Sequence, residues 1–347
     1  MPHRGKDSPA GKPGNVEAMA AAASFVTVDE SSAGQRLDNF LATHLKGVPK
    51  SHVYRIVRSG EVRVNKGRVD AAYRLEPDDV VRIPPVRIAE KSLNPSIEAA
   101  SRAFSAGTAG NTRGLALDIL FEDDALLAIN KPAGMAVHGG SGISFGVIEG
   151  LRAMRSEAKF LELVHRIDRE TSGVLLIAKK RSALTAMHAM LRGESAQRIE
   201  KHYYALVKGN WLDERRHIRT KLVKYVTAGG ERRVSVDEED GQESHTIVTR
   251  VEKLTGATLL DCQIMTGRTH QIRVHLGSTG YPIIGDDKYG DFALNKHVAA
   301  VKHGGLKRMF LHARRMAFPH PLSGEKIIIE APLSADLEKY LEYLRRS

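Results

Sequence analysis

The stretch His165-Arg166-Ile167-Asp168-Arg169-Glu170-Thr171-Ser172-Gly173 leads directly into an apolar run at residues 174–178. An apolar run of this length, bounded by a glycine, is typical of a buried strand. Polar side chains therefore gather where this strand begins, and a rigid sheet can hold them in fixed directions. A carboxylate placed there, at Asp168, has the chemistry of a nucleophile or a base. The residues alone also fit a structural Asp–Arg pair that caps a turn.

Further strands and helices are expected around this stretch, from residue 117 to the end of the chain. Short apolar runs predict strands at residues 126–129, 174–178, 203–207, 246–251 and 259–264. Helical spacing of apolar residues predicts helices around residues 184–191, 272–276 and 337–344. Because these strands and helices do not alternate regularly, the pattern favours an α+β fold over a doubly wound one.

A smaller unit precedes this block, at residues 34–86. Apolar residues stand at helical spacing at positions 37–45 and again at 53–57. Residues 61–67 read as a strand that runs into a tight turn, residues 68–69 continue it, and residues 80–83 close the unit. This helix–helix–hairpin unit resembles the S4 RNA-binding module. The resemblance implies that basic side chains contact RNA phosphates, although each could be part of an ordinary solvated face. The basic residues concerned are Arg36, Lys50, Arg55, Arg58 and Arg63.

Composition limits the class of protein. A chain of 347 residues is long enough for about two domains with tails. Its net charge of +11 favours a polyanionic partner, and RNA, DNA and an anionic membrane all fit that charge. No apolar run approaches the roughly 18 residues that a membrane span needs. The single cysteine, Cys262, cannot form an intramolecular disulfide, so we expect a cytoplasmic protein.

Two segments lack periodicity and separate the folded units. Residues 1–24 are rich in Gly, Pro, Ala and Lys, which predicts a disordered basic tail. Residues 87–115 become rich in Ala, Ser, Gly and Thr, which predicts a linker. The expected organisation is therefore a tail at 1–24, an S4-like domain at 34–86, a linker at 87–115 and a larger domain at 116–347.

The larger domain resembles a known enzyme family. The motif around Asp168, continued by Val174-Leu175-Leu176, is similar to the catalytic motif of the RluA family of pseudouridine synthases. Asn130-Lys131-Pro132-Ala133-Gly134 and Thr266-Gly267-Arg268-Thr269-His270-Gln271-Ile272-Arg273 match further family segments in the expected order. The resemblance covers residues 117–333, with small departures at Ile167 and Glu170. It implies a large mixed, mainly antiparallel sheet behind the S4-like domain.

The resemblance also implies roles for individual residues. Asp168 is the catalytic carboxylate, which attacks C1′, attacks the uracil ring or removes a sugar proton. Tyr203 stacks on the uracil and assists proton removal. Arg273 is the basic partner of Asp168, with Arg268 as the alternative, because a guanidinium can hold a carboxylate with two parallel hydrogen bonds. The residues expected to bind the substrate are Arg166, Arg268 and Leu311.

These observations lead to one expected function and two alternatives. We expect a monomeric pseudouridine synthase that isomerises specific uridines in 23S (large-subunit) ribosomal RNA, without cofactor or metal. His270 and His275 do not suggest a metal site, because five residues along a helix place them about 140° apart around its axis. The alternatives are a noncatalytic RNA-binding ribosome-assembly factor and a synthase of the same family that acts on transfer RNA.

Overall fold

The computed structural model describes residues 23–29, 32–45, 48–86, 117–139, 146–301 and 305–347. The chain divides into two compact units, Met1–Ser92 and Leu93–Ser347, and each is described by itself. The linker predicted at residues 87–115 lies outside the described residues, as does the predicted tail except for its last two residues. None of the described helices is long and apolar enough to cross a membrane.

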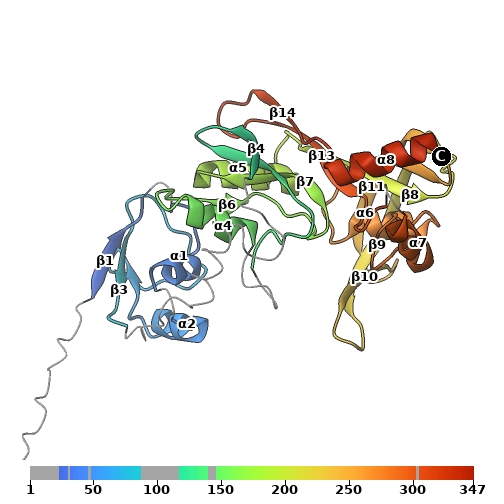
Figure 1. Ribbon diagram of the computed structural model, residues 1–347. Coiled ribbons are helices and arrows are strands. Elements are labelled where there is room, and N and C mark those ends of the chain that lie inside the picture. The colour runs from blue at the N-terminus through green and yellow to red at the C-terminus, as the bar shows by residue number, and fades with distance from the viewer. Residues whose placement is uncertain (1–22, 30–31, 46–47, 87–116, 140–145, 302–304) are drawn as a thin grey trace, which may run out of the picture. The chain divides into compact units, whose positions relative to one another are not determined.

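The N-terminal unit combines two helices with a three-stranded sheet, in the order β1-β3-β2 (Figure 1). Its apolar core comes from the helix faces that the sequence spacing predicts, with Phe40 of the first helix and Ile56 of the second both buried. The predicted helix–helix–hairpin arrangement is confirmed. The elements are β1 (Ser24–Thr27), α1 (Leu37–His44), α2 (Lys50–Arg58), β2 (Arg63–Val64) and β3 (Val80–Ile83).

Strand β1 is not expected from the sequence pattern. It begins at Ser24, within the stretch assigned to the tail, and pairs antiparallel with β3 through Ser24 and Ile83. It is an edge strand of four residues, and its Phe25 is largely exposed. A strand this short, with an apolar side chain facing solvent, gives no period-2 pattern to recognise.

The C-terminal unit contains a larger set of strands and helices. Its strands are β4 (Asp118–Glu122), β5 (Leu126–Lys131), β6 (Glu162–Leu163), β7 (Ser172–Ala178), β8 (Glu200–Lys208), β9 (Arg215–Val226), β10 (Arg232–Val236), β11 (Gln242–Leu254), β12 (Ala257–Ile264), β13 (Leu311–Pro319) and β14 (Lys326–Glu330). Its helices are α4 (Val147–Met154), α5 (Arg181–Arg192), α6 (Gln271–Ser278), α7 (Phe292–Ala300) and α8 (Ala335–Arg346).

The strands of this unit form one 11-stranded sheet among the described residues. Its order is β10-β9-β11-β12-β8-β13-β7-β5-β4, with β14 paired to β13 and β6 paired to β7. Every described pair is antiparallel except β7 with β13. The predicted α+β fold with a large mixed, mainly antiparallel sheet is therefore confirmed.

The strand that follows the Asp168 motif is buried on both faces. Leu175 and Ile177 of β7 belong to the same apolar cluster as residues of α4, whereas Val174 and Leu176 pack with residues of α5. Since alternate side chains of a strand point to opposite faces, helices α4 and α5 cover opposite faces of the sheet here. Strand β7 is therefore a rigid, fully enclosed support for the loop that precedes it.

Gly173 lets β7 and β13 approach each other closely. Its φ is +108°, and a Cβ atom at this position would collide with the backbone of Ala313 in β13. An L-residue at this position would be strained for both reasons. Because the two strands meet here, Leu311 at the start of β13 lies close to the loop that carries Asp168.

Candidate active site

The loop that carries Asp168 is held by the turn that follows β5. Lys131, at the end of β5, is completely buried, and its Nζ donates to the carbonyl oxygens of Pro132, Met135 and Arg169 at 2.7, 2.9 and 3.0 Å. Gly134 N also donates to Arg169 O at 2.9 Å. The Asn130–Gly134 string therefore has a structural function: it fixes the backbone next to Asp168.

Burial changes the charge equilibrium of this lysine. Removal from water lowers the pKa of Lys131 to about 7, against the opposing effect of the nearby Glu170 and Asp168 carboxylates. A side chain with three carbonyl acceptors around one nitrogen is nevertheless well satisfied as a hydrogen-bond donor. Its contribution is to hold two loops together.

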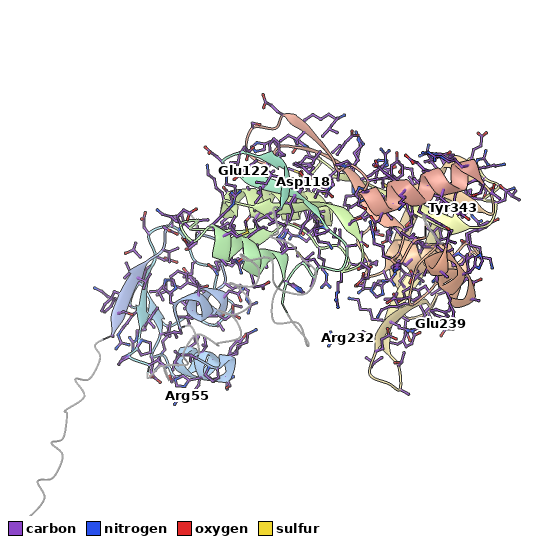
Figure 2. The ribbon with its side chains drawn as sticks, in the orientation of Figure 1. Arg55, Asp118, Glu122, Arg232, Glu239 and Tyr343 are labelled. Carbon is purple, nitrogen blue, oxygen red and sulfur yellow. The ribbon has the colours of Figure 1, made fainter. Side chains whose placement is uncertain are left out.

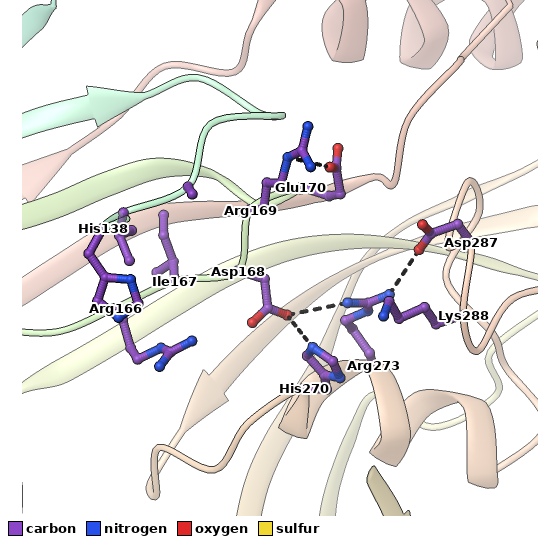
Figure 3. A pocket seen from close by; sticks show the side chains of 12 residues that line it. His138, Arg166, Ile167, Asp168, Arg169, Glu170, His270, Arg273, Asp287 and Lys288 are labelled. Carbon is purple, nitrogen blue, oxygen red and sulfur yellow. Dashed lines mark hydrogen bonds and ion pairs between the residues drawn. The ribbon is translucent and has the colours of Figure 1, made fainter. Parts of the chain in front are cut away.

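Asp168 faces two nitrogen-bearing side chains from the segment around α6 (Figure 3). Its Oδ2 lies 3.5 Å from Arg273 Nη1 and 3.9 Å from His270 Nε2. The Asp168 side chain is 24% exposed, whereas that of Arg273 is 3% exposed. The carboxylate therefore reaches the cavity surface while its cationic partner is enclosed in the protein.

The structure corrects one expectation about Arg273. Its two parallel hydrogen bonds go to Asp286, from Nε to Oδ2 at 2.7 Å and from Nη2 to Oδ1 at 2.6 Å, and not to Asp168. Nη2 also contacts Asp287 at 3.2 Å, which leaves Nη1 for Asp168. The guanidinium prefers Asp286 because that carboxylate is completely buried beside it, in the loop after Gly285.

Charges around Arg273 keep it cationic inside the protein. Burial by itself lowers the pKa of Arg273, but the hydrogen bonds and charge of Asp286, with Asp168 and Asp287, raise it above its usual value. The Asp286 carboxylate is stabilised in turn, because it also accepts hydrogen bonds from the backbone N–H groups of Lys288 and Tyr289. Arg273 is thus a fixed positive charge behind Asp168.

The alternative partner, Arg268, is engaged elsewhere. Its Nε donates to Glu243 O at 3.0 Å and its Nη1 to Gln242 Oε1 at 3.1 Å, both on β11. Between the two arginines of the motif, only Arg273 contacts Asp168 in the described part of the chain. Arg268 nevertheless lines the cavity in front of Asp168, so its position also fits a contact with substrate.

Six residues singled out from the sequence line one small cavity of about 80 Å³. Tyr203 comes from β8 and Leu311 from β13, which are neighbours in the sheet. A larger cavity of about 390 Å³ shares Arg166, Asp168 and Arg273 with the small one. The six residues are Arg166, Asp168, Tyr203, Arg268, Arg273 and Leu311.

Tyr203 presents an aromatic wall in this cavity. It is buried in the main apolar cluster, and burial, with the nearby Asp168 charge, raises its pKa well above the usual value. Its phenol therefore stays protonated at neutral pH. Tyr203 and the aliphatic Leu311 lie on the same face of the neighbouring strands β8 and β13, where they form a wall suited to a flat, partly apolar ring such as a nucleobase.

Sequence reasoning did not assign several residues of this site. Asp286, Asp287 and Lys288 belong to the Gly285-Asp286-Asp287-Lys288-Tyr289-Gly290 string, which resembles a family segment and suggests a tight loop near the active site, without a role for any single residue. His270 belongs to the Thr266–Arg273 motif, but the sequence suggests no role for it apart from the metal site that the helical spacing argues against. The described residues contain no group of three or more His, Cys, Asp or Glu side chains arranged to hold a metal ion.

The five basic residues of the N-terminal unit that are predicted to contact RNA are all exposed, but they differ in their partners. Arg36 makes a bidentate pair with Asp38, at 3.1 and 2.8 Å. Arg55, labelled in Figure 2, contacts His52 on the same helix, and Arg63 donates to the carbonyl oxygens of Gly60 and Lys66. Lys50 and Arg58 both project from α2 into solvent.

Fold and site together match a defined family. The pattern of the RNA pseudouridylate synthase family matches residues 125–278, which contain the Asp168, Tyr203 and Arg273 motifs, and that of the S4 domain matches residues 35–81. The chain belongs to the RluA family of pseudouridine synthases, which are RNA isomerases. The resemblance inferred from the motifs is therefore confirmed.

Close relatives extend over nearly the whole chain. The chain is 50% identical to the ribosomal large subunit pseudouridine synthase C of Escherichia coli (strain K12), over 93% of this chain and 96% of that protein. The protein of the same name from Salmonella typhi is also 50% identical, over 92% and 96% of the two chains. That from Haemophilus influenzae is 48% identical, over 96% and 98%.

Solved structures share the fold at lower identity. The human RNA pseudouridylate synthase domain containing 4 matches with a TM-score of 0.54 and 22% identity, over 73% of this chain and 98% of that chain. The human protein named RNA pseudouridylate synthase domain containing 1 matches with a TM-score of 0.50, also at 22% identity, over 67% of this chain and 95% of that chain. These two matches show the fold.

Proposed function

We propose that this protein isomerises specific uridines of 23S ribosomal RNA to pseudouridine, with Asp168 as the catalytic carboxylate. The substrate is suggested by relatives of about 50% identity that are named for the large ribosomal subunit. The observation that carries the residue assignment is the position of Asp168. It lies at the surface of a cavity, in front of a buried arginine and beside an aromatic wall.

A uridine in folded RNA must leave its helix to reach this cavity. Enzymes that act on a base inside structured nucleic acid extrude the nucleotide and hold the base by stacking and by contacts to its edge. The uracil would stack on the wall that Tyr203 and Leu311 form, and the exposed Arg166, which lines both cavities, would contact the RNA beside it. Arg268 is placed to contact the substrate as well.

The reaction rearranges one glycosidic bond within the bound nucleotide. The bond from C1′ to N1 breaks, the uracil turns while it stays bound, and a bond from C1′ to C5 forms. C5 loses its proton and N1 gains one, so that atoms and electrons balance and the product is an isomer of uridine. Asp168 supplies the carboxylate oxygen that attacks the sugar or the ring or removes a sugar proton, and Tyr203 is placed near the base for the proton steps.

The N-terminal unit adds affinity for RNA. We infer that Lys50, Arg55, Arg58 and Arg63, with a smaller contribution from Arg36, contact phosphates of the ribosomal RNA. The support is the match to the S4 domain and the exposure of these side chains. We further infer that the protein acts as a monomer in the cytoplasm.

Substitution of Asp168 tests the catalytic assignment. Asp168→Asn keeps the shape of the side chain but removes its charge, so we expect pseudouridine formation on 23S RNA to fall by at least about 10⁴-fold. RNA affinity should stay within a few-fold of the wild type. Asp213→Asn, which changes an exposed acid that pairs with Arg216 at 3.7 Å, is the matched control and should retain full activity.

Pseudouridine mapping in a deletion strain tests the substrate. Specific positions of 23S RNA should lose pseudouridine and regain it when the wild-type gene, but not the Asp168→Asn gene, is restored. Loss confined to transfer RNA would contradict the ribosomal substrate. Unchanged modification by the Asp168→Asn protein would contradict the catalytic role and favour the noncatalytic RNA-binding alternative.

A further inference from the structure

His270 adopts a backbone conformation that is unusual for a residue with a side chain. It precedes helix α6 with φ 54° and ψ 20°, in the left-handed region. Among the described residues, the other non-glycine positions with positive φ are Asn65, Lys66 and Asp78, all in the N-terminal unit. Strained backbone of this kind tends to persist at functional sites, where surrounding contacts hold it in place.

A chain of hydrogen bonds fixes the imidazole of His270. The backbone N–H of Val234, on β10, donates to Tyr289 Oη at 2.9 Å, and Tyr289 Oη lies 2.8 Å from His270 Nδ1. Tyr289 Oη accepts from Val234 and can donate its own proton to Nδ1. On the other edge of the ring, Nε2 lies 3.9 Å from Asp168 Oδ2 (Figure 3).

These hydrogen bonds favour one tautomer of a neutral His270 ring. When the Tyr289 hydroxyl donates a hydrogen bond to Nδ1, the proton of the ring is on Nε2 and points at the Asp168 carboxylate. The opposite tautomer would point the Nε2 lone pair at a carboxylate oxygen, which is repulsive. The Tyr289 hydroxyl therefore acts on Asp168 through the ring of His270.

The surroundings favour the neutral form of that ring. Burial lowers the pKa of His270; Asp168 and Asp286 oppose this effect, and the positive charges of Arg273 and Lys288 add to it. These four charged groups and Tyr289 are the titratable neighbours that face it. At neutral pH the ring is then a single-proton donor with a defined direction.

Both contacts of Asp168 with this segment fall on the same oxygen. Arg273 Nη1 and His270 Nε2 each approach Oδ2, at 3.5 and 3.9 Å. Two donors on one oxygen prevent the carboxylate from rotating and leave Oδ1 directed away from them. The separation of 3.9 Å exceeds a hydrogen bond, but catalytic hydrogen bonds are often long without substrate and shorten when substrate binds.

We propose that His270 is a positioning residue, locked by Tyr289, which donates from Nε2 to Oδ2 of Asp168 and thereby reserves Oδ1 as the oxygen that reacts with the uridine. The inference rests on the proposed role of Asp168. It adds a second donor to Arg273 and assigns different tasks to the two carboxylate oxygens.

Two substitutions at position 270 separate this role from a structural one. Asn tolerates the left-handed backbone well and can still contact Tyr289, but its side chain is too short to reach Asp168. Gln reaches farther and can donate an amide N–H to Oδ2, although its backbone is no less strained. We expect His270→Asn to lower kcat by about 10- to 100-fold at unchanged KM, and His270→Gln to recover most of that loss.

Tyr289→Phe tests the lock, because it removes the hydroxyl and retains the ring that stacks on the Arg273 guanidinium at 5.1 Å. We expect a loss of about 3- to 10-fold in kcat, since the ring of His270 can then adopt either tautomer. The double variant with His270→Asn should equal His270→Asn alone, because the hydroxyl that Tyr289→Phe removes acts through His270. Tyr281→Phe, which removes the hydroxyl of a tyrosine packed on Trp211, is the control and should have wild-type kcat.

Three outcomes would overturn the inference. These are wild-type kcat in His270→Asn, a lower kcat in His270→Gln than in His270→Asn, and losses that multiply in the double variant. An inactive Asp168→Asn enzyme combined with a fully active His270→Asn enzyme would leave the proposed function intact and reject only the role of His270. An active Asp168→Asn enzyme would reject the proposed function itself.

Discussion

At the scale of single residues, the site depends on the buried Arg273, whose main partner is Asp286 and not Asp168. Asp286 is completely buried and makes two short hydrogen bonds to Arg273, whereas Asp168 makes one longer contact. A guanidinium enclosed to this extent needs a permanent counter-charge. Asp286 supplies it, so Asp168 remains available for the substrate.

Removal of this counter-charge should destabilise the catalytic unit. We expect Asp286→Ala to lower the free energy of unfolding by about 3 to 5 kcal/mol, because it leaves Arg273 buried without its bidentate partner. Asp287→Ala removes an acid that is 68% exposed and should cost less than about 1 kcal/mol. Urea denaturation followed by the fluorescence of Trp211, the single tryptophan, reports on this unit alone. Equal losses in the two variants would contradict the role of Asp286.

The residues that sequence reasoning identified and those that it missed differ in the kind of information they need. Asp168, Tyr203 and Arg273 stand in motifs that can be recognised one at a time. The preference of Arg273 for Asp286 depends on which of two adjacent acids is buried, and a Gly-Asp-Asp string does not carry that information. The structure decides it, because Gly285 has φ +81° and its Cα packs against the backbone of Arg308.

At the scale of elements, predictions are accurate where one face of an element is uniformly apolar. Strand β7 and helix α5, which ends at Gly193 in the left-handed conformation, follow their patterns closely. Strands β9 and β10 are not predicted. Half of the twelve residues of β9 are basic and its apolar residues do not alternate with polar ones, whereas β10 is only five residues long. Helices α4 and α7 are not predicted either. Helix α4 contains Gly150, which disfavours a helix, and α7 buries a single residue, Val298, so its sequence carries no apolar stripe.

Helix α2 allows a test of RNA binding by the N-terminal unit. Lys50 and Arg58 are exposed on this helix, so replacement of both by Gln should weaken binding to 23S RNA. The slope of log K against log salt concentration should become shallower by about 1 to 2, because up to two phosphate contacts are lost. Arg36→Gln is the matched control, since Asp38 already neutralises that guanidinium, and it should change the slope least. An unchanged slope in the double variant would contradict phosphate contact by α2.

At the scale of the whole molecule, family motifs supplied what periodicity could not. Apolar patterns predict an α+β class and a small helical unit before it, but not the order of eleven strands or the parallel pairing of β7 with β13. That pairing joins segments about 140 residues apart in sequence, through Ser172 and His312. Contacts over such separations depend on the complete packing of the sheet and leave no local signal.

Two buried histidines link the stability of this sheet to pH. His275 of α6 lies between Ser244 and Thr246 of β11, at 2.7 and 2.9 Å, and His312 of β13 contacts Ser172 and Ala331. Both side chains are completely buried, and burial lowers the pKa of each to about 4. In the described fold both rings are therefore neutral at pH 7.

Acidification should destabilise the C-terminal unit as the pH falls from about 6.5 to about 4. In the unfolded chain these histidines regain pKa values of about 6.5, so between pH 6.5 and 4 the unfolded state binds more protons. Stability therefore falls as pH decreases through this window, by up to about 3 kcal/mol for each ring. Urea denaturation of the wild type, followed by Trp211 fluorescence from pH 7.5 to 4.5, measures the fall. His275→Gln should make it shallower, whereas His297→Gln, which changes an exposed ring on α7, should leave it unchanged. A pH-independent free energy of unfolding across this window would show that neither buried ring carries the linkage.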